Sequence, residues 1–396
     1  MASAKLAERL LQLGGIENAL RIRLGLEQAW ALSRAGEPAS AVVAIESSIA
    51  VATEAGDLLL EGRARAALGR QLIPEDAPRA GRVLEEALAI HRELGDHGHE
   101  GITLMWAASV SLNCGDSDSA WEQLNAARKI FRALGYRRYE GKVHANQSVL
   151  ARLRGWFDEA EDAAAMALAI HAEVGDLASR PPVLTNYAWL VSLRQGAAAG
   201  RPFLEEARAL SEKLVIPFSA THAEHTLAVL DLVEGRTALA RRCLRSVAVR
   251  YIEVGHPEGA LLALSWRALA AALDGELERG FQLATEVVEK AKKVPRSWLR
   301  SLLFARACGA LARVGEPALA LETWSACDLQ GPFTDRPIER LECLVYGRWV
   351  HTSCDEAAAA QVCIDEVETL MRRYRVSVDS VVGRLSQLSV DGGLNG

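Results

Sequence analysis

Turn signals recur along this chain with a period of about forty residues, and this regularity limits the possible folds more than any other feature of the sequence. In one series of turns a glycine is followed by a polar residue, as at Gly56-Asp57, Gly95-Asp96, Gly135-Tyr136 and Gly175-Asp176. A second series lies half a period away and contains Gly36-Glu37, Gly115-Asp116, Gly235-Arg236 and Gly315-Glu316. Two series of turns divide each repeat into two segments of about 17 residues.

Each segment between two turns has the pattern of an amphipathic helix. Its apolar residues fall at positions i, i+3, i+4 and i+7, which places them on one face of a helix. Glycine favours the left-handed cap that ends a helix, and an aspartate directly after it can cap the next helix. Residues 87–96 almost repeat as residues 167–176, two periods later. We therefore expect nine helical hairpins, which start near residues 16, 57, 96, 136, 177, 217, 256, 296 and 336.

The charge balance argues against direct binding to nucleic acid. The chain has 45 Lys and Arg against 51 Asp and Glu, a formal net charge of −6. A surface that binds duplex nucleic acid normally carries an excess of basic residues, because contacts to phosphates supply most of its affinity. Half of the residues are apolar, as in ordinary globular proteins, and the low aromatic content of 6% favours helix over sheet.

The hairpins are expected to form one continuous array. A hairpin of this size cannot bury its apolar face alone, so successive hairpins must stack on one another. We expect an all-α solenoid over residues 16–375 with a 40-residue period. Residues 1–15 are predicted to form a partial or capping helix, because leucines precede Gly14-Gly15 there as they precede the other turns. Residues 376–396 lose the period and are predicted to form a flexible tail.

The N-terminal residues do not resemble an export signal. Residues 1–9 carry charges of both signs, and only Leu10-Leu11 follow before Gln12, so the apolar core of a signal peptide is missing. The longest apolar runs, such as residues 259–266, are shorter than the roughly 20 residues of a membrane-spanning helix. The seven cysteines include no CxxC pair, which favours free thiols in a reducing compartment. We expect a cytoplasmic protein that does not bind a membrane.

Small residues recur five positions after the turn glycine that precedes the second helix of most repeats. Examples are Ala41, Ala120, Ala160, Ala240 and Ala320. This spacing resembles the tetratricopeptide repeat. The 40-residue length and the Leu-Gly-Asp ending resemble its longer variety, found in kinesin light chains and in the sensor regions of bacterial signal-transduction ATPases. The resemblance covers about residues 16–375, and it implies a right-handed superhelix whose first helices line a concave groove for peptides or partner proteins.

The resemblance also indicates where such a groove would bind. Members of the family often carry an Asn nine residues before the turn glycine. Asn146 stands nine residues before Gly155, and Asn186 follows one period later. By resemblance, these two amides would hydrogen-bond the backbone of a ligand, since an amide both donates and accepts. The same position in other repeats and the position one turn earlier complete the predicted partner-binding set: Lys142, Asn146, Asn186, His222, Trp106, Trp266 and Arg306.

These residues also have structural interpretations. An Asn in the middle of a helix can lie on a solvated face, and Trp106 and Trp266 are typical of aromatic residues that anchor one helix against another. Lys142 would meet a carboxylate if the groove holds a ligand. His222 lies three residues before His225 on one helix face, but a metal ion would need a third ligand, so no metal site is expected.

No motif of an enzyme was found in the sequence. The chain has no Gly-x4-Gly-Lys-Ser/Thr loop, no Gly-x-Ser-x-Gly elbow and no His-Glu-x-x-His helix. We predict a non-catalytic interaction module without a cofactor, which acts as scaffold or sensor in a bacterial regulatory assembly and binds a protein or peptide. The alternatives are a small-molecule or signal-peptide receptor and an α/α-toroid enzyme, in which the chain ends would have to meet. An uncapped terminal repeat also offers an apolar face for a homodimer.

Overall fold

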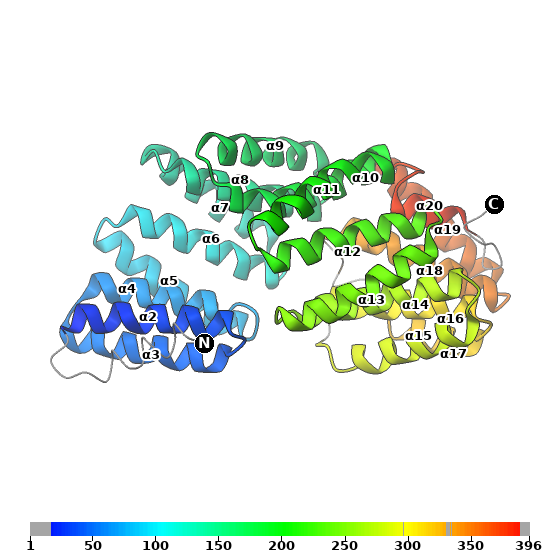
Figure 1. The fold of residues 1–396 in the computed structure, drawn as a ribbon, viewed down its shortest axis with the longest axis horizontal. Helices are drawn as coiled ribbons and strands as arrows, with labels where there is room; N and C mark the ends of the chain where they lie inside the picture. Colours follow the sequence, from blue (N-terminus) through cyan, green and yellow to red (C-terminus); the bar gives the residue numbers. More distant parts are fainter. Residues whose placement is uncertain (1–16, 296, 330–332, 334, 389–396) are drawn as a thin grey trace. The chain divides into compact units, whose positions relative to one another are not determined.

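The computed structural model describes residues 17–295, 297–329, 333 and 335–388, and within these residues it is all-α (Figure 1). They contain helices, one 3-10 turn (η1, Leu177–Ser179) and no strand. The predicted fold class of helical hairpins is therefore confirmed. The chain divides into two compact units, Met1–Leu150 (unit 1) and Ala151–Gly396 (unit 2).

Unit 1 consists of helical hairpins that follow one another along the chain. Its helices are α2 (Asn18–Arg34), α3 (Pro38–Ala55), α4 (Leu58–Leu72), α5 (Ala77–Glu93), α6 (His97–Asn113) and α7 (Ser117–Ala133). The next helix, α8 (Arg137–Leu153), begins in unit 1 and ends in unit 2. The predicted capping helix at residues 1–15 lies outside the described residues.

Unit 2 continues the same pattern and ends in a short extra helix. Its hairpin helices are α9 (Phe157–Glu173), α10 (Arg180–Gln195), α11 (Ala197–Lys213), α12 (Pro217–Val233), α13 (Thr237–Glu253), α14 (Pro257–Leu273), α15 (Leu277–Ala291), α16 (Trp298–Arg313), α17 (Pro317–Ser325), α18 (Pro337–Ser353) and α19 (Ala357–Tyr374). The extra helix is α20 (Val381–Gln387). Among the described residues, unit 1 contains the hairpins α2/α3, α4/α5 and α6/α7, and unit 2 contains α10/α11, α12/α13, α14/α15, α16/α17 and α18/α19.

The turns form for the reasons that the sequence indicates. Gly56 and Gly95 adopt φ angles of 67° and 64°, in the left-handed region that glycine enters without steric cost. The Asp57 carboxylate accepts a hydrogen bond from the Leu60 amide at 3.0 Å, so it caps the helix that follows. Asp116 caps α7 in the same way, through the Ser119 amide at 2.9 Å. One glycine and one aspartate thus end one helix and start the next.

Small residues allow the helices to pack closely. Ala41, Ala160 and Ala240 have no exposed surface, as expected for side chains at the crossing of two helices. At Gly280, the equivalent position of another hairpin, an added Cβ would lie 2.9 Å from Val314 and 3.2 Å from the backbone nitrogen of Ala272. Even a methyl group is too large at that crossing, because protein interiors have almost no free volume.

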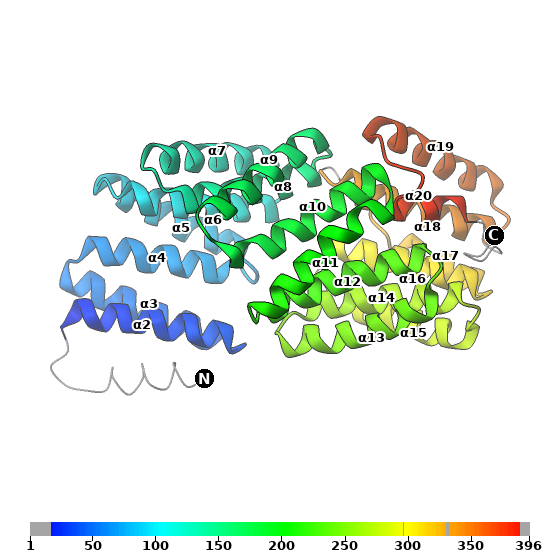
Figure 2. The same ribbon diagram turned by 45° about the horizontal axis from the view of Figure 1, so that its top comes forward.

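The expectation of a flexible tail over residues 376–396 is wrong for residues 376–388, which are packed. Three apolar side chains of α20 are buried: Val381, Val382 and Leu385. Helix α20 contacts α10, α12 and α18, and Figure 2 shows it beside α18. Hydrogen bonds on both sides fix it, from the Ala197 amide to the Asp379 carbonyl at 2.8 Å and from Trp349 Nε1 to the Leu388 carbonyl at 3.1 Å. Residues 389–396 lie outside the described residues.

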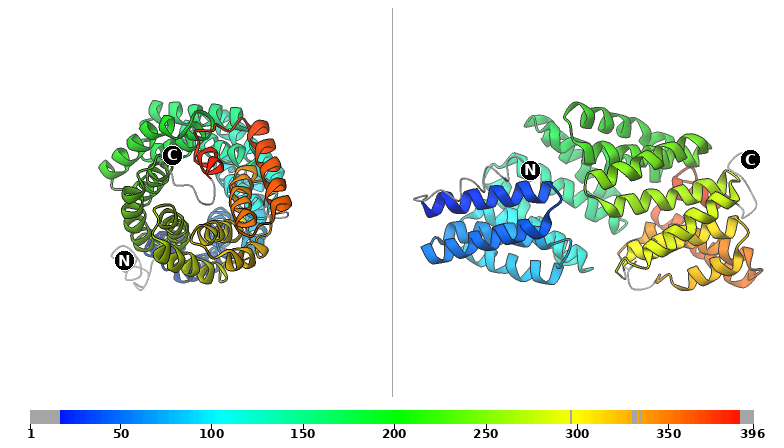
Figure 3. Two further views of the ribbon diagram at one scale, coloured as in Figure 1. Left: turned by 90° about the vertical axis from the view of Figure 1, so that its right-hand side faces the viewer. Right: turned by 60° about the horizontal axis from the view of Figure 1, so that its bottom comes forward.

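The two ends of unit 2 meet. The rings of Phe157 in α9 and Tyr374 in α19 lie 6.0 Å apart, and the Ser377 amide donates to the Leu193 carbonyl at 2.8 Å. In the left view of Figure 3 the red α20 lies beside the green helices, in agreement with its contacts to α10 and α12. The sequence favoured an open array, but unit 2 closes on itself because its last hairpin and α20 bury apolar surface against its first helices.

We expect Leu385→Ala to destabilise unit 2 by about 2–5 kcal/mol, because it removes a fully buried side chain from the contact that closes the unit. Chemical denaturation followed by circular dichroism measures this loss. Val378→Ala, at a side chain that is 56% exposed, is the matched control and changes the stability by less than about 0.5 kcal/mol. Equal effects of the two substitutions would mean that the C-terminal segment is not packed.

Candidate functional site

Unit 2 contains a cavity of about 340 Å³ on the side of its first helices. Side chains from α10, α12, α14, α16 and α18 line it, together with Arg152 at the end of α8 and Tyr251 of α13. The 40-residue period explains which residues meet there, since equivalent positions of successive hairpins lie side by side. One such position contributes Asn186, Thr226, Trp266 and Arg306, and another contributes His222, Leu262, Leu302 and Glu342.

Four of the seven predicted binding residues line this cavity together: Asn186, His222, Trp266 and Arg306. The other three belong to unit 1. Asn146 is exposed, the Lys142 ammonium lies 5.1 Å from the centre of the Tyr139 ring, and Trp106 is half-buried with the Arg70 guanidinium 5.6 Å from its ring centre. A binding role for these three residues stays a prediction.

Aromatic rings form much of the wall. Trp189, Phe218, Tyr251 and Trp298 line the cavity beside Trp266. The ring centres of Phe218 and His256 lie 5.1 Å apart, and those of Phe218 and Tyr251 lie 6.3 Å apart. Such rings offer a large apolar surface with few rotatable bonds, which suits the binding of an apolar or aromatic group.

A buried ion pair supports one side of the cavity. The Arg306 guanidinium donates to both carboxylate oxygens of Glu342, from Nε at 2.7 Å and from Nη2 at 3.1 Å. Tyr346 donates its hydroxyl to the same carboxylate at 3.1 Å, and the Trp266 ring centre lies 4.1 Å from the Arg306 guanidinium. Burial opposes the charge of Arg306, but the charge and hydrogen bonds of Glu342 outweigh it and raise the pKa of Arg306. Arg306 therefore positions Trp266 and Glu342 around the cavity.

We expect Glu342→Ala to destabilise unit 2 by about 3–5 kcal/mol, because Arg306 is left buried without its counter-charge. The double variant Arg306→Met/Glu342→Leu removes both charges and recovers most of that loss. Denaturation curves of the three proteins test this. Glu366→Ala, which breaks the more exposed pair with Arg340, is the control and costs less than about 1 kcal/mol. A mild effect of Glu342→Ala alone would contradict the assigned role of the pair.

His222 and His225, two histidines of the cavity, are neutral at physiological pH. Burial lowers the pKa of His222 to about 4, with smaller contributions from the charges of His256 and Arg152. Burial also lowers the pKa of His225 to about 3, with contributions from His222 and Arg306. His225 Nδ1 lies 3.2 Å from the Tyr251 hydroxyl. A neutral imidazole has one donor and one acceptor, so these side chains can hydrogen-bond a ligand without adding charge.

We expect the stability of unit 2 to fall as the pH decreases from about 6.5 to about 4. In this range the unfolded histidines bind protons that the folded His222 and His225 exclude, so protonation favours the unfolded state. The loss is on the order of a few kcal/mol. Urea denaturation over this pH range measures it, and His225→Gln reduces the slope. A slope that His225→Gln leaves unchanged would contradict the assignment.

Several polar atoms at the cavity have no partner among the described residues. They are Arg152 Nε, Glu339 Oε2 and His225 Nε2, all buried. Arg152 Nη1 and Glu339 Oε1 lie 3.7 Å apart, which is too long for a hydrogen bond. The amide of Asn186 likewise makes no hydrogen bond to another described residue. Since buried polar groups are almost always satisfied in native proteins, these atoms mark where a ligand can donate and accept hydrogen bonds.

The sequence reasoning missed several residues of the cavity. Glu342 lies three periods after His222 and one after Leu302, so the repeat could have identified it. Trp189 lies one turn after Asn186 on the same helix face, so its position in the sequence could also have placed it at the cavity. Tyr251 belongs to a second helix, and Arg152 approaches only because unit 2 closes on itself. No pattern in the sequence indicates those two.

Two further kinds of site were sought in the described part of the chain. It contains no group of three or more His, Cys, Asp or Glu side chains that could hold a metal ion. None of its helices is long and apolar enough to cross a membrane.

Comparison with known proteins identifies the fold. No protein-family model and no curated protein sequence matches the chain. The structure is similar to a Rap protein complexed with competence and sporulation factor, with a TM-score of 0.66 and 11% identity over 89% of this chain and 98% of that one. It is also similar to a signal transduction ATPase with numerous domains and a tetratricopeptide repeat sensor from Pyrococcus horikoshii, with a TM-score of 0.58 and 12% identity over 82% of this chain and 49% of that one. The predicted tetratricopeptide-like α-solenoid fold is confirmed.

Proposed function

We propose that this protein is a non-catalytic sensor or scaffold module of a regulatory assembly, and that the cavity of unit 2 binds a segment of a peptide. The observation that supports this most directly is the set of buried polar atoms without partners, which lie between aromatic walls. A Rap protein of similar fold is complexed with competence and sporulation factor, and this supports a ligand-binding role for a fold of this kind.

A peptide matches the chemistry of the cavity. Each peptide unit carries one N–H donor and one carbonyl acceptor, which suit Glu339 Oε2 and Arg152 Nε, while the Asn186 amide can pair with either. Aromatic rings such as Trp189 and Trp298 would hold an apolar side chain of the ligand. The charged residues of the lining balance, because Arg306 faces Glu342 and Arg152 lies near Glu339. The occupant should therefore be uncharged where it enters the cavity.

The alternative is a small-molecule receptor, and one observation favours it. A cavity of about 340 Å³ is at the lower end of the range for small-ligand sites, so it could hold a single aromatic molecule. Enzymatic activity has less support, although the ends of unit 2 meet. The carboxylates that line the cavity, Glu339 and Glu342, each lie beside an arginine and do not form a free acid–base pair.

We expect Asn186→Ala to weaken peptide binding by about five- to thirtyfold without changing the melting temperature, because the amide bonds the ligand and no other described residue. Peptides selected from a synthetic mixture on the immobilised protein, and then measured one by one by calorimetry, test this. Asn146→Ala is the matched variant in unit 1, and its effect shows whether that unit also contacts the peptide. If no peptide binds and a metabolite raises the melting temperature instead, the small-molecule alternative is correct.

A further inference from the structure

A second groove lies on the side of the second helices in unit 2, between α13 and α15 and above α14. It consists of two adjoining hollows of about 700 Å³ and 520 Å³, and both are lined by Arg245 and Arg267. On α13 the lining runs from Ala238 to Ile252, which corresponds to about 20 Å of helix. The groove is therefore long enough to hold a helical segment of another protein.

One half of this groove is strongly basic. Five arginines line it: Arg241, Arg242, Arg245, Arg267 and Arg279. Arg241 is paired with both acidic residues of this half, Asp274 and Glu276. The other four arginines have no ion pair among the described residues. Burial and the positive charges of Arg279, Arg245 and Arg241 lower the pKa of Arg267, and the charge of Glu286 opposes them.

The other half of the groove is apolar. Val249 and Ile252 of α13 are 56% and 60% exposed there, and Leu261 and Leu264 of α14 complete the floor. Lys290 of α15 and Lys293, just after α15, line its edge, and Lys290 pairs with Glu286 at 2.8 Å. Across both halves, seven Lys and Arg face three Asp and Glu, although the whole chain carries a net charge of −6. Positive charge is thus concentrated beside exposed apolar surface.

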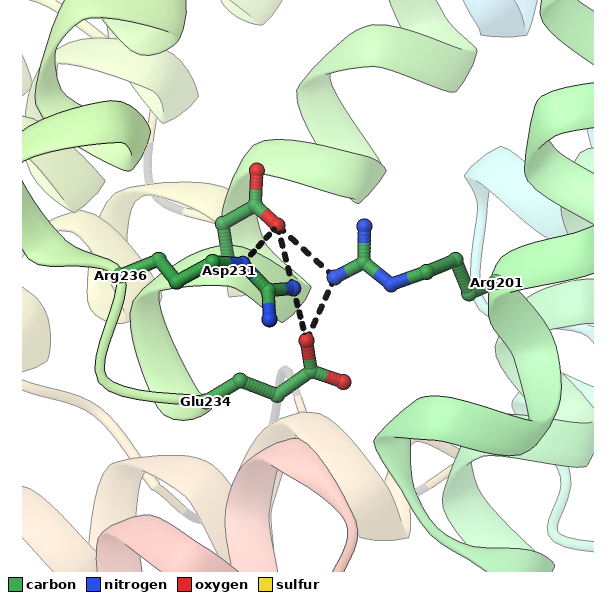
Figure 4. A network of polar contacts seen from close by, with 4 residues as sticks. All are labelled: Arg201, Asp231, Glu234 and Arg236. Atoms are coloured by element: carbon green, nitrogen blue, oxygen red, sulfur yellow. Dashed lines mark hydrogen bonds and ion pairs between the residues drawn. The ribbon is translucent and has the colours of Figure 1, made fainter.

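The preceding repeat provides an internal comparison, because it forms an equivalent hollow over α12 that is electrically balanced. Figure 4 shows its network, in which Asp231 and Glu234 each bind both Arg201 and Arg236. Three of the positions that hold arginine in the basic groove are occupied one period earlier by other residues: Glu205 for Arg245, Leu227 for Arg267 and Leu239 for Arg279. The hairpin stack therefore forms without these arginines.

We propose that the groove of α13, α14 and α15 binds an acidic amphipathic helix of a partner protein. Its acidic residues would pair with Arg242, Arg245 and Arg279, and its apolar face would cover Val249 and Ile252. Nucleic acid fits less well, because half of the groove is aliphatic and offers no partner to a phosphate. This site is independent of the cavity on the first-helix side, since its lining shares no residue with that cavity.

Fluorescence anisotropy with labelled synthetic peptides tests the proposal on the whole chain. The probe is a peptide of Glu and Leu in which Leu recurs at i, i+3, i+4 and i+7 on one helix face. A scrambled peptide of the same composition and a peptide with Gln for Glu are the comparison probes. We expect both to bind about tenfold more weakly than the amphipathic acidic peptide, and we expect its binding to weaken as salt is added.

The protein variants follow the internal comparison, so that folding is preserved. The triple variant Arg245→Glu/Arg267→Leu/Arg279→Leu introduces the residues that the preceding repeat has at these positions. The variant Ile252→Glu does the same at position 252, where the equivalent residue of the preceding repeat is Glu212. Each should weaken binding of the amphipathic peptide by about tenfold or more. Arg132→Glu/Arg82→Leu/Arg372→Leu makes the same change of charge at exposed arginines elsewhere and should leave binding unchanged.

Three results would overturn the proposal. The first is equal binding of the scrambled peptide, which would mean that charge alone is recognised. The second is displacement of the peptide by a DNA oligonucleotide that binds more tightly, which would identify a phosphate-binding site. The third is unchanged affinity of the variant with three arginines replaced, because the peptide would then bind elsewhere.

Discussion

Stacking of one hairpin on the next is the constraint on which the rest of this structure depends. A single hairpin leaves its apolar face in water, so the chain is stable only when neighbouring hairpins cover each other. Fully buried residues such as Ala41, Ala160 and Ala240 lie at the contacts where this happens. Because every hairpin stacks in the same way, equivalent residues come together in space. That is why Asn186, Thr226, Trp266 and Arg306 line one cavity.

Closure of unit 2 has a second consequence for the structure, because it buries charged and titratable side chains away from water. The contact of α20 with α10, α12 and α18 joins the last hairpin to the first helices of the unit. Inside, the charge of Arg306 is stabilised mainly by Glu342, and burial lowers the pKa of His222 and His225. The result is a cavity with the neutral imidazoles of His222 and His225, aromatic walls and unsatisfied polar atoms, and such polar atoms are costly to bury without hydrogen-bond partners.

Departures from the repeat are more informative about binding than the repeat itself. The hollow over α12 contains arginines that Asp231 and Glu234 neutralise, whereas the groove over α14, one period later, contains Arg245, Arg267 and Arg279 without an ion pair among the described residues. Stacking requires only small and apolar residues at the helix contacts, so exposed positions can differ between repeats without harm to the fold. The two sides of unit 2 therefore present different chemistries, one aromatic and neutral and the other basic and apolar.

The sequence by itself determined the helices, the turns and the pairing of helices into hairpins, because glycine caps, aspartate caps and apolar spacing act locally. It also indicated Asn186, His222, Trp266 and Arg306, since the period places equivalent residues together. The packed segment 376–388, the pairing of Arg306 with Glu342 and the approach of Arg152 and Tyr251 were decided only by the tertiary structure. These contacts join residues far apart in the chain, and the closure that brings them together depends on side-chain packing that no local pattern encodes.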